Sequence, residues 1–140
     1  MSIFNFNHRF GARIPIKESL NEVNGASEIF EWSSEEAKRI YGETLQGRSS
    51  DNKIHVYYQP VGVVAALVPW NFPISMLARS LACSFAAGNS TVIKSAELTP
   101  LATTSFFAQA VHNAGVPKGL INIVTGYGVE AGAALTSNQD

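Results

Sequence analysis

Residues 62–73, GVVAALVPWNFP, restrict the fold more than any other part of the chain. An unbroken apolar run over residues 61–68 is typical of a strand that is buried in a parallel sheet. Pro69 ends this predicted strand, and Pro73 suits the first turn of a helix, where an N–H group has no partner within the helix. Asn71 therefore lies between a strand end and a helix start, which is where open α/β sheets bind their ligands.

The same unit of strand followed by helix recurs along the rest of the chain. The helix after Pro73 is expected to stop at Gly88, a natural left-handed cap. Its apolar face is formed by Ile74, Leu77, Leu81 and Phe85. Further strands are predicted at 91–93 and 120–124, with a helix between them that has Thr99 as its cap, Pro100 in its first turn and its end at Gly115. A last helix follows the turn at 126–132. This alternation predicts an α/β fold, a parallel sheet of Rossmann-like βαβαβ units.

Upstream of this region the pattern is different. Residues 17–42 are predicted to form one long helix, with a single apolar stripe toward the core. The stripe consists of Leu20, Val23, Ala26, Phe30, Ala37 and Ile40. Residues 47–52, GRSSDN, indicate a turn. Ile54, Val56 and Tyr58 then alternate with polar residues, which predicts a half-buried strand.

Charge and composition exclude some classes of protein. The net charge of −1 gives no electrostatic reason to expect nucleic acid or an anionic membrane as a partner, and no apolar run approaches the length of a transmembrane helix. Residues 1–16 are interpreted as a divergent or disordered tail, with a mitochondrial transit peptide as the alternative. Residues 17–140 are expected to form one domain. The three histidines show no metal-ligand spacing, so no metal site is predicted.

Three strand-to-helix junctions carry the residues of chemical interest, at 69–72, 94–97 and 126–128. A parallel sheet gathers the carboxyl ends of its strands at one edge, and we therefore predict a single crevice for a nucleotide or cofactor. The third junction reads GYGVEAG, which is near the dinucleotide fingerprint but has three residues rather than two between its last glycines. A plain glycine turn is the alternative there.

These residues resemble the NAD(P)-dependent aldehyde dehydrogenases. The resemblance rests on PWNFP at 69–73, AAG at 86–88, VIKSAELTP at 92–100 and AGVPKGLINIVTG at 114–126, in that order. Upstream, WSSEEAKRIYGE at 32–43 and QPVGVV at 59–64 are most similar to the succinate-semialdehyde dehydrogenase branch. The resemblance covers about residues 16–140 and implies that 17–140 form an incomplete cofactor-binding domain of this family.

The resemblance implies a role for each matching residue. Asn71 matches the catalytic oxyanion residue, whose side-chain amide donates to the oxygen of the reacting aldehyde. A simple helix cap is the alternative for this asparagine. The positions that match the lining of the nicotinamide side are Val68, Pro69 and Trp70, and those that match contacts to the adenine are Gly128 and Val129.

Lys94 and Glu97 match the pair that holds the adenosine ribose hydroxyls. Between them Ser95, in place of the usual proline, and Ala96 belong to the same cofactor loop. A carboxylate accepts a hydrogen bond from a 2′-hydroxyl and repels a 2′-phosphate, so Glu97 favours NAD, with NADP as the alternative. A glutamate that offsets the dipole of the following helix is the structural alternative.

Arg79 lies eight residues after Asn71, about two turns along the same predicted helix. It matches the position that contacts the substrate carboxylate in the succinate-semialdehyde branch, and a solvated helix arginine is the alternative. Cys83 does not match the family's nucleophile and is interpreted as structural. The positions of the nucleophilic cysteine and the general-base glutamate lie beyond Asp140, so the isolated chain is expected to be inactive.

The function implied by the resemblance is part of an oxidoreductase that converts succinate semialdehyde, or a similar semialdehyde, to the acid with NAD(P). The expected partner is a small aldehyde, with no nucleic acid and no membrane, and the parent enzyme is expected to be a homo-oligomer. The expected location is cytoplasmic, with a mitochondrial one as the alternative. The alternative function is a non-catalytic nucleotide-binding or interaction module that pairs through an open sheet edge.

Overall fold

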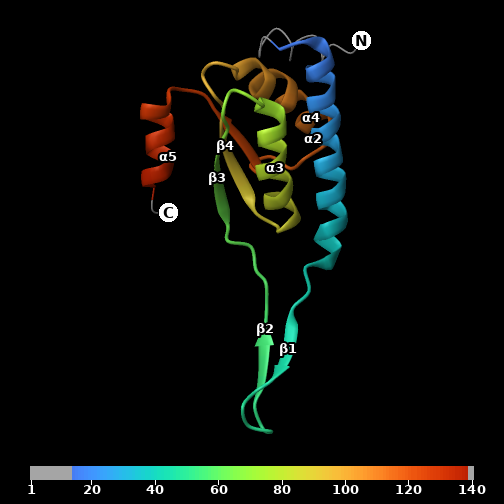
Figure 1. Ribbon diagram of the computed structural model, residues 1–140. Helices are drawn as coiled ribbons and strands as arrows, with labels where there is room; N and C mark the ends of the chain where they lie inside the picture. The colour runs from blue at the N-terminus through green and yellow to red at the C-terminus, as the bar shows by residue number, and fades with distance from the viewer. Residues whose placement is uncertain (1–13, 139–140) are drawn as a thin grey trace.

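The computed structural model describes residues 14–138. In this part of the chain a long helix and a hairpin precede a three-stranded sheet with helices on both faces (Figure 1). The elements are α2 (Ile16–Glu36), η1 (Ala37–Arg39), β1 (Glu43–Gln46), β2 (Lys53–Val56), β3 (Val63–Leu67), α3 (Pro73–Ala86), β4 (Ser90–Lys94), the π-helical turn η2 (Ala102–Phe107), α4 (Ala108–Asn113), β5 (Ile121–Val124), the π-helical turn η3 (Gly128–Gly132) and α5 (Ala133–Ser137). None of these helices combines the length and the apolar content needed to cross a membrane.

The larger sheet has the strand order β3-β4-β5, and both neighbouring pairs are parallel. Leu67 lies opposite Lys94, and Lys94 lies opposite Val124, so the three strands end at the same edge. α3 and the η2–α4 segment cover one face, α2 packs outside α3, and α5 lies beyond the other face (Figure 1). This arrangement confirms the predicted parallel α/β fold.

The apolar run before Pro69 forms an edge strand that is buried on one face only. Ala66 and Val68 are buried, whereas Val63 is 65% exposed and Leu67 is 48% exposed. The prediction of a buried strand is therefore correct for only one face of β3. Alternate side chains of a strand point to opposite faces, and the second face of β3 is largely open in the described chain. The central strand β4 carries the fully buried Ile93 instead.

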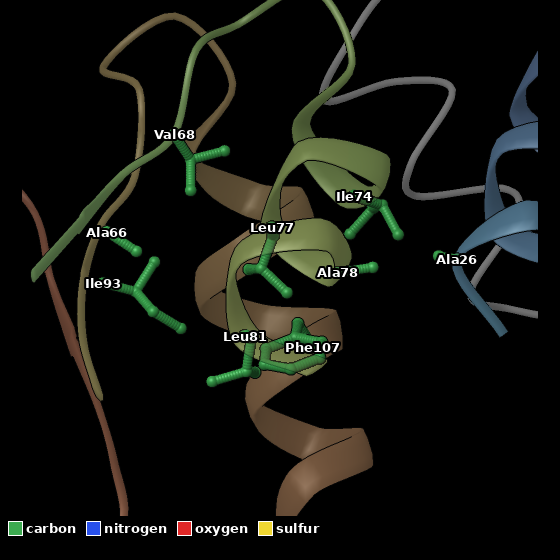
Figure 2. Packing of buried hydrophobic residues seen from close by; sticks show 9 residues of the cluster. All are labelled: Ala26, Ala66, Val68, Ile74, Leu77, Ala78, Leu81, Ile93 and Phe107. Carbon is green, nitrogen blue, oxygen red and sulfur yellow. The ribbon is translucent and has the colours of Figure 1, made fainter. Parts of the chain in front are cut away.

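α3 supplies the centre of the core, as its sequence pattern predicts. Pro73 occupies the first helical position, and the chain turns after Ala86 through Gly88, whose φ is 79°. Figure 2 shows Leu77 and Leu81 of α3 between the strand residues and Phe107, with Ala26 of α2 on the other side. All nine residues of this cluster are buried, so α3 is fixed from both sides.

α2 forms as predicted, but its buried face overlaps the predicted stripe only in part: Ala26 is buried and Phe30 packs against the core. Its buried residues are Ser19, Glu22, Ala26 and Ser33. Leu20 and Ile40 of the predicted stripe are exposed. The distance between packed helices depends on the side chains at their contact, and three of the four buried residues are small. The fourth, Glu22, bonds to the start of α3, as described below.

Residues 40–62 leave the body of the molecule as a hairpin (Figure 1). β1 pairs antiparallel with β2, with Glu43 opposite Val56 and Gln46 opposite Lys53, and the predicted turn at 47–52 joins them. The predicted helix ends at Arg39 rather than Gly42, and β1 was not predicted. The prediction of a half-buried β2 was wrong, because only Val56 of this strand is partly covered.

The helix after β4 begins at Pro100 and runs through η2 to the end of α4, close to the predicted span, with Gly115 at a φ of 71°. The prediction of Thr99 as its cap was wrong: in the described chain the buried Thr99 hydroxyl has no hydrogen-bond partner. The hydroxyls of Thr103 and Thr104 both donate to the Pro100 carbonyl.

Candidate functional site

The carboxyl ends of β3 and β4 face the segment after β5 across a cleft of about 590 Å³. The described residues that line it are Leu67, Val68, Pro69, Lys94, Gly128, Gly132, Ala133 and Thr136. A volume of this size is ordinary for a pocket that holds a small molecule or cofactor. Each of the three predicted junctions therefore contributes at least one residue to a single cleft.

Lys94 and Glu97 form an ion pair at this cleft. Lys94 ends the central strand, and its carbonyl accepts a hydrogen bond of 3.0 Å from the Val68 N–H. Its side chain is 7% exposed, and its Nζ lies 2.7 Å from Oε2 of Glu97, whose side chain is 42% exposed. The hydrogen bond from Lys94 lowers the pKa of the Glu97 carboxyl, which is therefore ionised at neutral pH. The pair thus presents a buried donor and an accessible acceptor side by side.

Asn71 lies where it was predicted, in the turn between the end of β3 and the start of α3, and it is exposed. The N-cap residue of α3 is Phe72. The N–H groups of Ile74 and Ser75 donate to Oε1 of Glu22, at 2.8 and 3.0 Å. The capping role that was the alternative for Asn71 is therefore filled by a glutamate from α2. Asn71 and Glu97 follow strands that end at the same edge of the sheet.

The remaining predicted cofactor residues have different surroundings. Ser95 and Ala96 are buried beside the cleft, and the Ser95 hydroxyl has no partner among the described residues. Trp70 and Val129 are exposed next to the lining residues Pro69 and Gly128. At Gly128 an added Cβ would meet no atom within 4 Å. The glycine therefore leaves the cleft open at that point.

Arg79 lies apart from this cleft. It lines a second groove of about 370 Å³ between α2 and α3, and it is exposed. The other lining residues are Gly25, Glu28, Ile29, Trp32, Ser33 and Cys83. Cys83 is exposed, and its interpretation as a structural residue rather than the nucleophile stays a prediction. Within residues 14–138 no group of three or more His, Cys, Asp or Glu side chains is placed to hold a metal ion.

Comparison with known proteins identifies the family. The sequence profile described as the aldehyde dehydrogenase family matches residues 11–140. The chain belongs to the aldehyde dehydrogenase family. It is 44% identical over 124 residues to a glutarate-semialdehyde dehydrogenase of Pseudomonas aeruginosa, which covers 89% of this chain and 26% of that one. It is 43% identical over 124 residues to the NADP(+) succinate-semialdehyde dehydrogenase of Escherichia coli K12, with the same coverage.

Solved structures of aldehyde dehydrogenases have the same fold over this span. A succinate-semialdehyde dehydrogenase from Burkholderia pseudomallei superposes with a TM-score of 0.91 at 37% identity, covering 96% of this chain and 28% of that one. An NADP-dependent enzyme from E. coli gives the same TM-score at 39% identity, with the same coverage. The chain thus spans about a quarter of the length of the curated relatives it matches.

Sequence reasoning missed several parts of this aldehyde dehydrogenase cleft. Gly132, Ala133 and Thr136 line it but were not predicted. They are spaced by one, three and four residues on the helical segment after Gly128, and that periodicity was a usable signal. Glu22 was missed because its contact with α3 joins residues 52 positions apart. A pattern within one helix does not reveal such a contact.

Proposed function

We propose that residues 17–140 are part of the cofactor-binding domain of an NAD(P)-dependent aldehyde dehydrogenase, and that the complete enzyme oxidises a semialdehyde to its acid. The observation that carries the proposal is the Lys94–Glu97 pair at the edge of a cleft formed by three strand ends. The family membership and the similarity to succinate- and glutarate-semialdehyde dehydrogenases support it.

The residues of the cleft fit a dinucleotide. Glu97 offers carboxylate oxygens to ribose hydroxyls, and Lys94 can donate to a hydroxyl oxygen while it remains bonded to Glu97. Gly128 leaves open space for a flat ring, and Val68 and Pro69 provide an apolar wall. When bound, NAD(P) would supply the acceptor for the hydride. The chain's own residues would orient the cofactor and exclude water from this wall.

The identity of the cofactor follows from the charge at the ribose. The ionised Glu97 repels a 2′-phosphate, which favours NAD. Lys94 is close enough to offset part of that charge, and the E. coli succinate-semialdehyde dehydrogenase relative carries NADP(+) in its name. We therefore assign NAD as the preferred cofactor and NADP as the alternative.

Asn71 is the proposed donor to the aldehyde oxygen. It is exposed in the turn after β3, and the N–H groups at the start of α3 are engaged by Glu22. An amide at this position would stabilise negative charge as it develops on the reacting oxygen, an effect of about 2.7–4 kcal/mol for one such donor. Arg79, in the groove between α2 and α3, is the proposed contact for the distal carboxylate of a semialdehyde.

The cofactor assignment is tested by calorimetric titration of the chain with NAD and with NADP. We expect Glu97→Ala to weaken NAD binding by about tenfold or more, because it removes hydrogen bonds to a charged acceptor. NADP binding should weaken less or improve, because the repulsion is removed as well. Glu35→Ala is the matched control: Glu35 forms the same kind of pair with Lys38, at 2.8 Å, away from the cleft.

A second variant tests the position of the cofactor. Gly128→Val should place a side chain into the cleft, starting from a Cβ that meets no protein atom within 4 Å. We expect it to abolish measurable NAD binding while the unfolding midpoint changes little. Equal NAD affinity of wild type, Glu97→Ala and Gly128→Val would contradict the assignment of this cleft.

A further inference from the structure

The start of α3 has a hydrogen-bonding requirement that its own sequence does not meet. The first N–H groups of a helix have no partner within it and need a cap. Pro73 has no N–H, and the Met76 N–H donates to the Phe72 carbonyl at 2.9 Å. The N–H groups of Ile74 and Ser75 remain, and the side chain of the N-cap residue Phe72 cannot accept a hydrogen bond.

Glu22 meets this requirement from another helix. Its Oε1 accepts from the Ile74 N–H at 2.8 Å and from the Ser75 N–H at 3.0 Å. Glu22 is 6% exposed, so these bonds are largely shielded from water. A carboxylate at a helix N-terminus also interacts favourably with the helix dipole. The cap of α3 therefore comes from α2, across a separation of 52 residues.

This cap lies directly after the turn that carries Asn71. We propose that Glu22 is a positioning residue for Asn71: it fixes the entry of the chain into α3 and so sets where the Asn71 amide lies. The role rests on the proposed function of Asn71 as the donor to the aldehyde oxygen. The cap itself is independent of that function.

The arrangement has a second consequence for the same site. Helix N-termini commonly bind anions through their free N–H groups. Because Glu22 engages the N–H groups of Ile74 and Ser75, these groups are not available to a negative charge that forms near this turn, and the Asn71 side chain can serve as its donor. Asn71 is free for this role because it does not serve as the cap, a task for which asparagine is among the preferred residues. Glu22 thus caps α3, and Asn71 is left to donate to the reacting oxygen.

The test uses the 15N-labelled chain without nucleotide and compares three variants. Glu22→Gln keeps a carbonyl oxygen as an acceptor, Glu22→Met keeps the volume but removes the acceptor, and Glu31→Ala changes an exposed glutamate on the same helix. Amide hydrogen exchange reports on the bonds of Ile74 and Ser75. The side-chain amide signal of Asn71 and the indole signal of Trp70 report on the turn, with the Trp32 indole as an internal reference.

In Glu22→Met we expect the exchange of Ile74 and Ser75 to rise by about tenfold or more, as for the loss of a charge-assisted hydrogen bond. The Asn71 and Trp70 signals should shift, and the Trp32 signal should not. Glu22→Gln should restore most of the protection and return the turn signals toward their wild-type positions. Glu31→Ala should match the wild type in the exchange of Ile74 and Ser75 and in the signals of Asn71 and Trp70.

Protection of Ile74 and Ser75 in Glu22→Met would overturn the cap, and unmoved Asn71 and Trp70 signals would overturn the positioning role. If Glu22→Met does not fold, amide exchange in the wild type tests the proposed cap instead. Ile74 and Ser75 must then exchange as slowly as Met76, and fast exchange refutes the proposal. Glu22→Gln then decides the positioning role, because its weaker neutral bond should shift the turn signals slightly and in proportion to the loss of protection. The nucleotide titrations above are independent of these measurements, so failure of either proposal can be distinguished from failure of the other.

Discussion

Asn89 joins the end of α3, the start of β4 and the residue before β3, and its removal should destabilise the chain by a predictable amount. Asn89 is buried, with 6% of its surface exposed. Its Oδ1 accepts from the Gly62 N–H at 3.0 Å, and its Nδ2 donates to the Ser84 carbonyl at 3.2 Å. The two hydrogen bonds differ in what their loss costs. After substitution the Ser84 carbonyl still accepts a bond from a backbone N–H, whereas the bond of the Gly62 N–H to Asn89 is lost.

In Asn89→Ala the N–H of the exposed Gly62 loses a hydrogen bond that is partly shielded from water, which should cost about 1–2 kcal/mol. The Ser84 carbonyl keeps the backbone N–H of Asn89 at 3.0 Å, so its loss is one ordinary hydrogen bond, about 1 kcal/mol. The expected total is about 2–3 kcal/mol, or roughly 5–10 °C in Tm for a chain of this length.

The measurement is urea unfolding followed by circular dichroism, with the free energy extrapolated to water. Asn122→Ala is the matched control, because the exposed Asn122 amide makes a single bond of 2.8 Å to the Gly119 carbonyl. That variant should lose less than about 1 kcal/mol. Equal losses in the two variants, or a loss below about 1 kcal/mol in Asn89→Ala, would refute the reasoning.

Two further predictions concern the core and the ion pair. Leu81→Ala should destabilise the chain by about 3–5 kcal/mol, because it opens a cavity at a side chain with no exposed area, whereas Leu98→Ala, at a leucine that is 68% exposed, should change the unfolding midpoint little. Similar shifts in the two leucine variants would contradict the assigned core. Because Lys94 lowers the pKa of Glu97, their pair should stabilise the folded chain above the ordinary carboxyl pKa and lose that contribution as the pH falls through the lowered value. Urea midpoints measured from neutral to acidic pH should therefore fall less steeply for Glu97→Gln than for wild type, and parallel curves would count against the pair.

The second half of the chain could be read from its sequence because its elements are separated by prolines and glycines with fixed conformational effects. Pro73 and Gly88 mark the two ends of α3 in the structure as they do in the sequence. The shared edge of the strands followed from topology alone, and it brought Lys94 and Gly128 into one cleft. The role of each site residue toward a cofactor or substrate stays a prediction.

Other features depend on contacts that a linear pattern does not contain. β1 has the sequence ETLQ, which has no apolar alternation, and it forms because β2 pairs with it. α2 adds Ala26 to the core, and it also buries serine and glutamate because it packs along α3 and bonds to the N-terminus of that helix. Thr99 has the residue type of a cap but does not act as one, since a favourable residue type does not ensure the required geometry.

The hairpin between η1 and β3 has a consequence for the chain's tolerance of length changes. Both ends of this excursion are anchored in the same body, because α2 packs along α3, which follows β3. The entropy of closing such a segment grows only with the logarithm of its length, so doubling it costs about 0.6 kcal/mol. Insertions or deletions at the tip, over residues 47–52, should therefore leave the cleft and its strand ends unaffected.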